Sequence, residues 1–90
     1  MSAEFDPKKD GANVKKHSVS LSEGDGVLND PLALTVEDEL AEGKQRFVTI
    51  GMNTFGSLMV VVHSYRGSGS RIISVRKAEP KERRNYEKGV

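Results

Sequence analysis

The chain of 90 residues contains no cysteine and no tryptophan. Without cysteine it cannot form a disulfide framework, a cysteine-ligated zinc site or a thiol nucleophile. Its longest hydrophobic run, residues 58–62, is far shorter than the roughly 20 residues of a membrane-spanning helix. No basic segment followed by a hydrophobic stretch opens the chain, so we expect no signal peptide and a cytoplasmic protein. With 36% hydrophobic and 30% charged residues, the composition is typical of a folded globular protein.

The charge is distributed unevenly along the chain, although the formal net charge is only +1. Residues 18–45 hold seven acidic residues and one lysine, a net charge of −6, whereas residues 63–90 hold eight basic and three acidic residues, a net charge of +5. Such an asymmetry indicates binding to nucleic acid or to a partner of opposite sign. The length predicts a single domain over residues 1–90.

Capping residues and hydrophobic periodicity predict seven secondary-structure elements. Asp6 and Pro7 suit the N-cap and first position of a helix, with Ala12 and Val14 as its core residues, and Ser20 with Glu23 matches a capping box. The predicted elements are helices over 7–17 and 20–28, strands over 32–36, 46–52, 58–66 and 71–77, and a helix over 80–88, with an acidic loop over 37–44. This order predicts an α+β fold: two N-terminal helices, a four-stranded antiparallel sheet and a C-terminal helix.

Arginines are concentrated on the predicted strands. Arg66 and Arg71 flank a Gly-Ser connection, Arg76 follows on the last strand, and Arg46 begins an earlier one. Strict alternation places Arg76 with Ile72 on one side of its strand and Arg71 on the other. A guanidinium group offers a rigid fork of donors for phosphate oxygens, so these residues could bind a phosphodiester. An alternative explains the arginines equally well: they lie at solvated ends of strands and form salt bridges with the acidic residues of 37–42.

Few other side chains suggest chemistry. His63 could transfer protons near neutral pH, but a histidine after a hydrophobic run is also typical of a packed core. His17 suits the C-terminus of a helix, and Tyr86 could either reach the sheet or pack its ring. No spacing of ligands predicts a metal site, and no glycine motif predicts a nucleotide, so we expect no cofactor.

Several stretches taken together resemble a known family. They are Phe5 to Lys9 with Asn13, Lys16 and His17, Asp30 to Thr35 with Glu37 and Asp38, Arg46 to Gly51, Leu58 to His63 with Arg66 and Gly67, Arg71 to Ser74 with Arg76 and Ala78, and Glu82 and Arg83 with Tyr86 and Glu87. In this order, over about residues 5–87, they are similar to the BrnT family, the toxins of bacterial type II toxin–antitoxin systems. The resemblance implies a RelE-like fold and a metal-independent ribonuclease that inhibits translation. It also implies a BrnA-like ribbon-helix-helix antitoxin, whose complex with the toxin binds operator DNA.

The resemblance also implies roles for individual residues. The implied catalytic residues are Arg66, Arg76, His63 and Tyr86, and the implied RNA-binding residues are Arg46, Arg71, Lys16 and Arg83. One departure from the family pattern lies before the last helix, where Glu79 and Pro80 replace a Ser or Thr cap. The alternative hypothesis is a binding module without catalysis, which acts as a co-repressor with its antitoxin.

Overall fold

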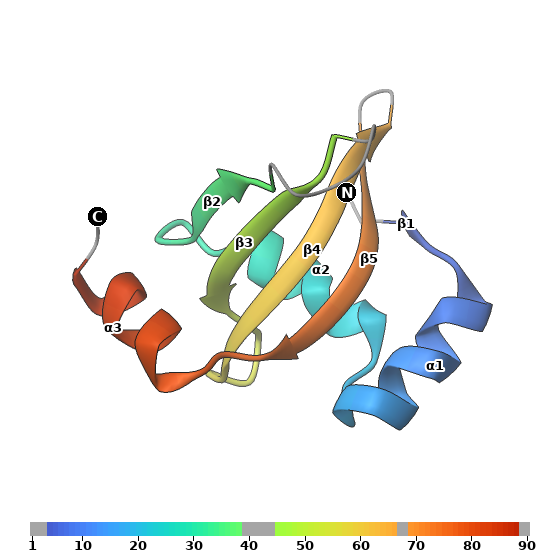
Figure 1. Ribbon diagram of the computed structural model, residues 1–90, viewed down its shortest axis with the longest axis horizontal. Coiled ribbons are helices and arrows are strands. Elements are labelled where there is room, and N and C mark those ends of the chain that lie inside the picture. Colours follow the sequence, from blue (N-terminus) through green and yellow to red (C-terminus); the bar gives the residue numbers. More distant parts are fainter. Residues whose placement is uncertain (1–3, 39–44, 67–68, 89–90) are drawn as a thin grey trace.

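The computed structural model describes residues 4–38, 45–66 and 69–88, and in this part of the chain a mixed sheet is flanked by helices (Figure 1). The sheet has five strands in the order β1-β5-β4-β3-β2. The strands are β1 (Glu4–Phe5), β2 (Leu34–Glu37), β3 (Phe47–Met52), β4 (Leu58–Arg66) and β5 (Gly69–Lys77). The helices are α1 (Pro7–His17), the 3-10 helix η1 (Leu21–Glu23), α2 (Gly24–Leu28) and α3 (Pro80–Lys88). Most of the predicted acidic loop, residues 39–44, lies outside the described residues.

The α+β class is confirmed, but the predicted architecture of two N-terminal helices, a four-stranded antiparallel sheet and a C-terminal helix is wrong. The sheet has a fifth strand, β1, which pairs in parallel with β5 through Glu4 opposite Arg71 and Phe5 opposite Ile72. Two residues are too few to show the alternation by which a strand is recognised in a sequence. The short N-terminal strand therefore covers part of the β5 edge without a signal in the sequence.

The predicted helix starts are largely confirmed. The side chain of Asp6 accepts a hydrogen bond from the Lys8 amide at 2.9 Å, and Pro7 occupies the first helical position. Ser20 caps the 3-10 helix η1 instead of an α-helix, because its hydroxyl accepts from the Ser22 amide at 3.3 Å and α2 begins only at Gly24. The N-terminal residue of α3 is Pro80, as predicted.

The pairing of β4 with β5 contains an irregularity that changes which side chains share a face. Val62 lies opposite Ser74, but the next residue, His63, lies opposite Ile72, so that Ile73 is an extra residue on β5. Such a bulge interrupts the alternation of side chains. The prediction that Ile72 shares a side with Arg76 is therefore wrong: Ile72 is buried on the face that α2 covers.

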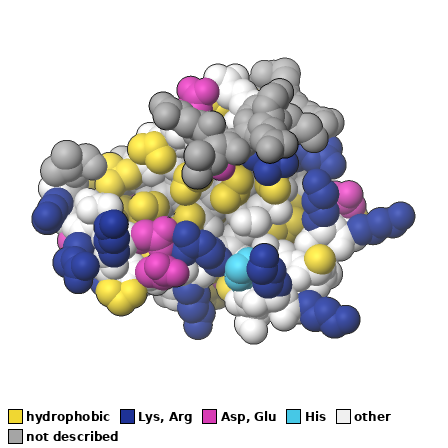
Figure 2. All heavy atoms as spheres, in the orientation of Figure 1, with side chains coloured by type: hydrophobic (Ala, Val, Ile, Leu, Met, Phe, Trp, Pro, Cys, Tyr) yellow, Lys and Arg dark blue, Asp and Glu magenta, His cyan; other side chains and the backbone are white. Residues whose placement is uncertain are grey.

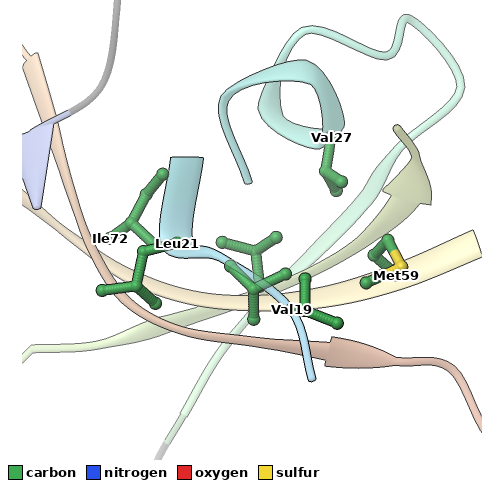
Figure 3. Packing of buried hydrophobic residues seen from close by; sticks show 7 residues of the cluster. Val19, Leu21, Val27, Met59 and Ile72 are labelled. Atoms are coloured by element: carbon green, nitrogen blue, oxygen red, sulfur yellow. The ribbon is translucent and has the colours of Figure 1, made fainter. Parts of the chain in front are cut away.

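The hydrophobic core lies between this covered face of the sheet and the segment from Val19 to α2 (Figure 3). Its buried side chains come from both layers and point toward one another: Val19, Leu21 and Val27 from the helical layer, and Met59, Val61, Ile72 and Val75 from the sheet. A Cβ atom at Gly24 would lie 2.9 Å from Cδ1 of Ile72 and 3.1 Å from Cγ2 of Val75. The glycine that weakens α2 as a helix is thus required for α2 to approach the sheet.

Polar contacts hold α1 against the edge of the sheet, in place of the predicted core residues. Val14 is 45% exposed, and the buried residue of α1 is Asn13. The Asn13 side-chain amide donates to the Val19 carbonyl at 2.7 Å and to the Val75 carbonyl at 2.9 Å, and its oxygen accepts from the Val75 amide at 3.2 Å. Asn13 therefore pairs with β5 as a neighbouring strand would.

Candidate functional site

The face of the sheet opposite α2 carries basic, hydroxyl and hydrophobic side chains, and we call it the open face. Val60 lies opposite Arg76, Val62 opposite Ser74 and Ser64 opposite Arg71, and Val60, Val62 and Ser64 share one side of β4. The bulge at Ile73 therefore brings Arg71 to the same face as Ser74 and Arg76, although strict alternation predicts the opposite. Arg71 and Arg76 are separated by four β4 positions, about 13 Å along the strand.

Arg76 is held by a carboxylate from the first turn of α3. Its Nη1 and Nη2 donate to Oε1 and Oε2 of Glu82 at 2.8 and 2.7 Å, and the side chains are 34% and 21% exposed. The hydrogen bond with Glu82 raises the pKa of Arg76, and the same bond lowers the pKa of Glu82, so that both groups are ionised at neutral pH. This two-point pairing fixes the plane of the guanidinium group on the open face.

The same carboxylate completes the N-terminus of α3. Glu82 Oε1 accepts a hydrogen bond from the Glu79 amide at 2.8 Å, which is the half of a capping box that the third helical residue supplies. The replacement of a Ser or Thr cap by Glu79 and Pro80 therefore leaves this half of the cap in place. Glu82 was not predicted as a site residue, although its position three residues after Glu79 is a sequence signal for this contact.

Tyr86 lies one helical turn after Glu82 and joins α3 to the turn before β2. Its hydroxyl donates to Oδ2 of Asp30 at 2.7 Å, and the same carboxylate accepts from the amides of Met52 and Leu32 at 2.8 and 2.9 Å. Burial alone would raise the pKa of Asp30, but these hydrogen bonds outweigh it and lower the pKa. The bond to Asp30 raises the pKa of Tyr86, so the phenol keeps its proton at neutral pH.

A hydrophobic groove continues the open face between β2, β3 and α3. It encloses about 350 Å³ and is lined by Leu34, Val36, Val48, Ile50, Asn85 and Lys88. Val36 is 63% exposed. Figure 2 shows hydrophobic side chains gathered on this face, with Lys and Arg side chains around them.

His63 lies on the covered face, away from Arg76. It is 1% exposed, and its Nε2 is 2.7 Å from Oγ1 of Thr49, which is 2.8 Å from Oγ1 of Thr35. Burial lowers the pKa of His63, and its Nδ1 has no hydrogen-bond partner in the described part of the chain. The structure therefore does not bring His63 to the other predicted catalytic residues, and its burial argues against a role in proton transfer to a substrate.

The remaining predicted residues lie at different places around the open face. Arg66 ends β4 opposite Gly69, at the end of the sheet where Arg71 lies, and its side chain is outside the described part. Arg46 precedes β3 at the same end, and its carbonyl accepts from the Asp38 amide at 2.8 Å. Lys16 lies on α1 beside Ser74, and Arg83 is exposed on α3. Arg71 joins Ser74 and Arg76 through the bulge, which has no signal in the sequence.

Among residues 4–38, 45–66 and 69–88, no group of three or more His, Cys, Asp or Glu side chains could hold a metal ion. Within the same ranges, no helix is long and hydrophobic enough to cross a membrane.

Two comparisons with known proteins point to the same family. Residues 5–82 match the model of a family described as the ribonuclease toxin BrnT of type II toxin–antitoxin systems. The fold is similar to the crystal structure of the Brucella abortus ribonuclease toxin BrnT, with a TM-score of 0.68 and 22% sequence identity over 88% of this chain and 97% of the other. A search of curated proteins gave no match.

Proposed function

This chain belongs to the BrnT family of ribonuclease toxins of type II toxin–antitoxin systems, and we propose that it is itself an endoribonuclease that inhibits translation in the cytoplasm. The observation that carries the proposal is the arrangement of Arg71, Ser74 and Arg76 on one face of the sheet. Arginine side chains in a row along a strand can contact successive phosphates of an RNA strand, and a phosphate contact of this kind is independent of sequence.

Arg76 is suited to bind the phosphate that is cleaved. Three of its five N–H donors are used, two by Glu82 and one by the Lys77 carbonyl at 3.2 Å. The edge formed by Nε and the second N–H of Nη2 carries no hydrogen bond to the described residues, and such an edge matches two phosphate oxygens. Glu82 is then a positioning residue that presents this edge to the substrate.

We propose cleavage by the RNA itself. The 2′-oxygen bonds to the adjacent phosphorus and loses its proton to water, the bond from phosphorus to the 5′-oxygen breaks, and that oxygen gains a proton. The products are a 2′,3′-cyclic phosphate and a 5′-hydroxyl. Arg76 stabilises the negative charge that develops on the phosphate oxygens in the transition state. No metal ion is required for these steps, and a donor such as Arg76 supplies the charge that a metal would otherwise supply.

Tyr86 is proposed to give a proton to the leaving oxygen, because it lies one helical turn after Glu82 on the same face of α3. Its hydroxyl would exchange its hydrogen bond with Asp30 for one with the substrate. Arg66, Arg71 and Arg46 are proposed to bind the strand at the far end of the open face. Arg83 is proposed as a further contact from α3. We do not include His63, because it is buried on the covered face.

We propose that a BrnA-like antitoxin with a ribbon-helix-helix DNA-binding part neutralises the toxin by covering the open face. Its acidic side chains would pair with Arg71 and Arg76, and hydrophobic ones would fill the groove beside Val36 and Val48. Operator DNA is bound only by this complex. A complex that leaves Arg71 and Arg76 exposed would refute this mode of neutralisation.

The test is incubation of the purified protein with RNA in EDTA, followed by analysis of the product ends. We expect cleavage that leaves 2′,3′-cyclic phosphates and that stops when the antitoxin is added. RNA that is bound with strong salt dependence but stays intact would refute the ribonuclease and support the non-catalytic co-repressor.

A further inference from the structure

A second basic site lies around the edge of the sheet from Arg76. A pocket of about 240 Å³ between α1 and β5 is lined by Lys9, Lys16 and His17 on one side and by Ser74 on the other, with Asn13 between them. Ser74 also lies on the open face, two residues before Arg76, which is about 7 Å along the strand. The pocket and the open face are therefore continuous.

The helix places its lysines over this pocket by its periodicity. Lys9, Asn13 and Lys16 are spaced by four and three residues, so they lie on one face of α1. The hydrogen bonds of Asn13 with Val75 fix that face against β5. Lys8 and Lys15 have the same spacing of seven residues, but neither lines the pocket.

Helix stability does not explain the lysines at the start of α1. Lys16 and His17 lie in the last turn, where the helix dipole favours positive charge. Lys8 and Lys9 both lie in the first turn, where the dipole disfavours positive charge, and of these two Lys9 lines the pocket. A positive charge at both ends of one pocket is instead the arrangement expected for binding an anion.

We propose that this pocket binds the backbone phosphate of a nucleotide that flanks the cleaved phosphodiester. The inference rests on the proposed function, since it takes the RNA strand bound at Arg76 over Ser74 and into the pocket. Lys9 and Lys16 neutralise the phosphate, and the Ser74 hydroxyl is available to donate to it. The ligand is the phosphate backbone of single-stranded RNA, without preference for a base.

The experiment compares two double variants of the full chain, Lys9→Ala with Lys16→Ala, and Lys8→Ala with Lys15→Ala. Both remove two charges from the same helix, and neither changes Asn13, so equal thermal midpoints check the fold. The probes are uncleavable 2′-O-methyl RNAs of two and six nucleotides, with binding measured by fluorescence anisotropy at several salt concentrations.

We expect the Lys9/Lys16 variant to lose affinity for the six-nucleotide probe. The slope of log K against log salt, which is negative, should become less steep by about 0.7, the contribution of one phosphate contact in a single strand. The Lys8/Lys15 variant should keep the slope of the native chain, and neither pair should alter binding of the two-nucleotide probe. Equal losses in both variants, or no loss in either, would overturn the second site.

Cleavage of unmodified RNA separates this inference from the proposed function. If the native chain cleaves RNA but the two double variants bind the long probe equally, the second site is wrong and the ribonuclease stands. If the long probe binds with the expected difference but RNA stays intact, the ribonuclease is wrong and the phosphate site stands.

Discussion

The replacement of Asn13 by alanine tests how α1 is held to the sheet. The side chain is 6% exposed and makes three hydrogen bonds, two with Val75 and one with Val19. The change would leave the Val75 amide and both carbonyls without these partners at a buried site. An unsatisfied buried polar group costs about 1–3 kcal/mol, so three of them predict a loss of roughly 3 kcal/mol or more.

Urea unfolding at pH 7.5 measures this loss. A domain of this size is stable by about 5–13 kcal/mol, so the variant should fold but have a clearly lower midpoint. The matched control is Asn29→Ala, which removes one exposed hydrogen bond, to the Asp25 carbonyl at 2.9 Å. A loss below 1 kcal/mol for Asn13→Ala, or a loss equal to that of the control, would refute the reasoning.

Three further predictions follow from the packing. Gly24→Ala should destabilise the fold by about 1–2 kcal/mol, because overpacking against Ile72 exceeds the gain in helix propensity. Gly11→Ala should stabilise the fold by about 0.5–1 kcal/mol, because its new Cβ atom would have no neighbour within 4 Å. Urea midpoints that shift in the same direction for both variants would contradict this. Burial lowers the pKa of His63, so below pH 6.5 the unfolded chain binds a proton that the folded chain does not. The free energy of unfolding should therefore decrease more steeply in the native chain than in His63→Gln as the pH is lowered from 7.5 to 5.5. Equal slopes for the two proteins would refute this. Tyr86→Phe should speed hydrogen exchange in α3 but not in α1, since its hydroxyl joins α3 to Asp30; unchanged exchange in α3 would contradict this contact.

The sequence predicted the parts of the fold that depend on local patterns. The cap at Asp6, the proline at the start of α3 and the buried first half of β4 each rest on residues close together in the chain. The parallel strand β1 depends on pairing with a segment far along the chain, and the bulge at Ile73 depends on the register between β4 and β5; the pattern of one segment contains neither. The same limit explains why Val14 was predicted in the core while Asn13 occupies it.

The sequence predicted which residue types form the candidate site better than it predicted how they are arranged. The concentration of arginines on the later strands was visible, and Arg71 and Arg76 do lie on one face. Strict alternation placed them on opposite faces, because one extra residue reverses the side of every residue beyond it. The ion pair of Arg76 with Glu82 joins a strand to the following helix. The position of Glu82 three residues after Glu79 was the one sequence signal for this ion pair.

The most direct test of the central claim is single-turnover cleavage of one RNA in EDTA by the native chain, Arg76→Ala and Arg84→Ala. Both variants remove one arginine, but Arg84 is exposed on α3 and has no place in the proposed site. We predict a loss of about 100-fold or more for Arg76→Ala, as expected when a donor to the transition state is removed, and a rate near that of the native chain for Arg84→Ala. Equal rates for the two variants, with both folded, would contradict the assignment of the open face as the ribonuclease site.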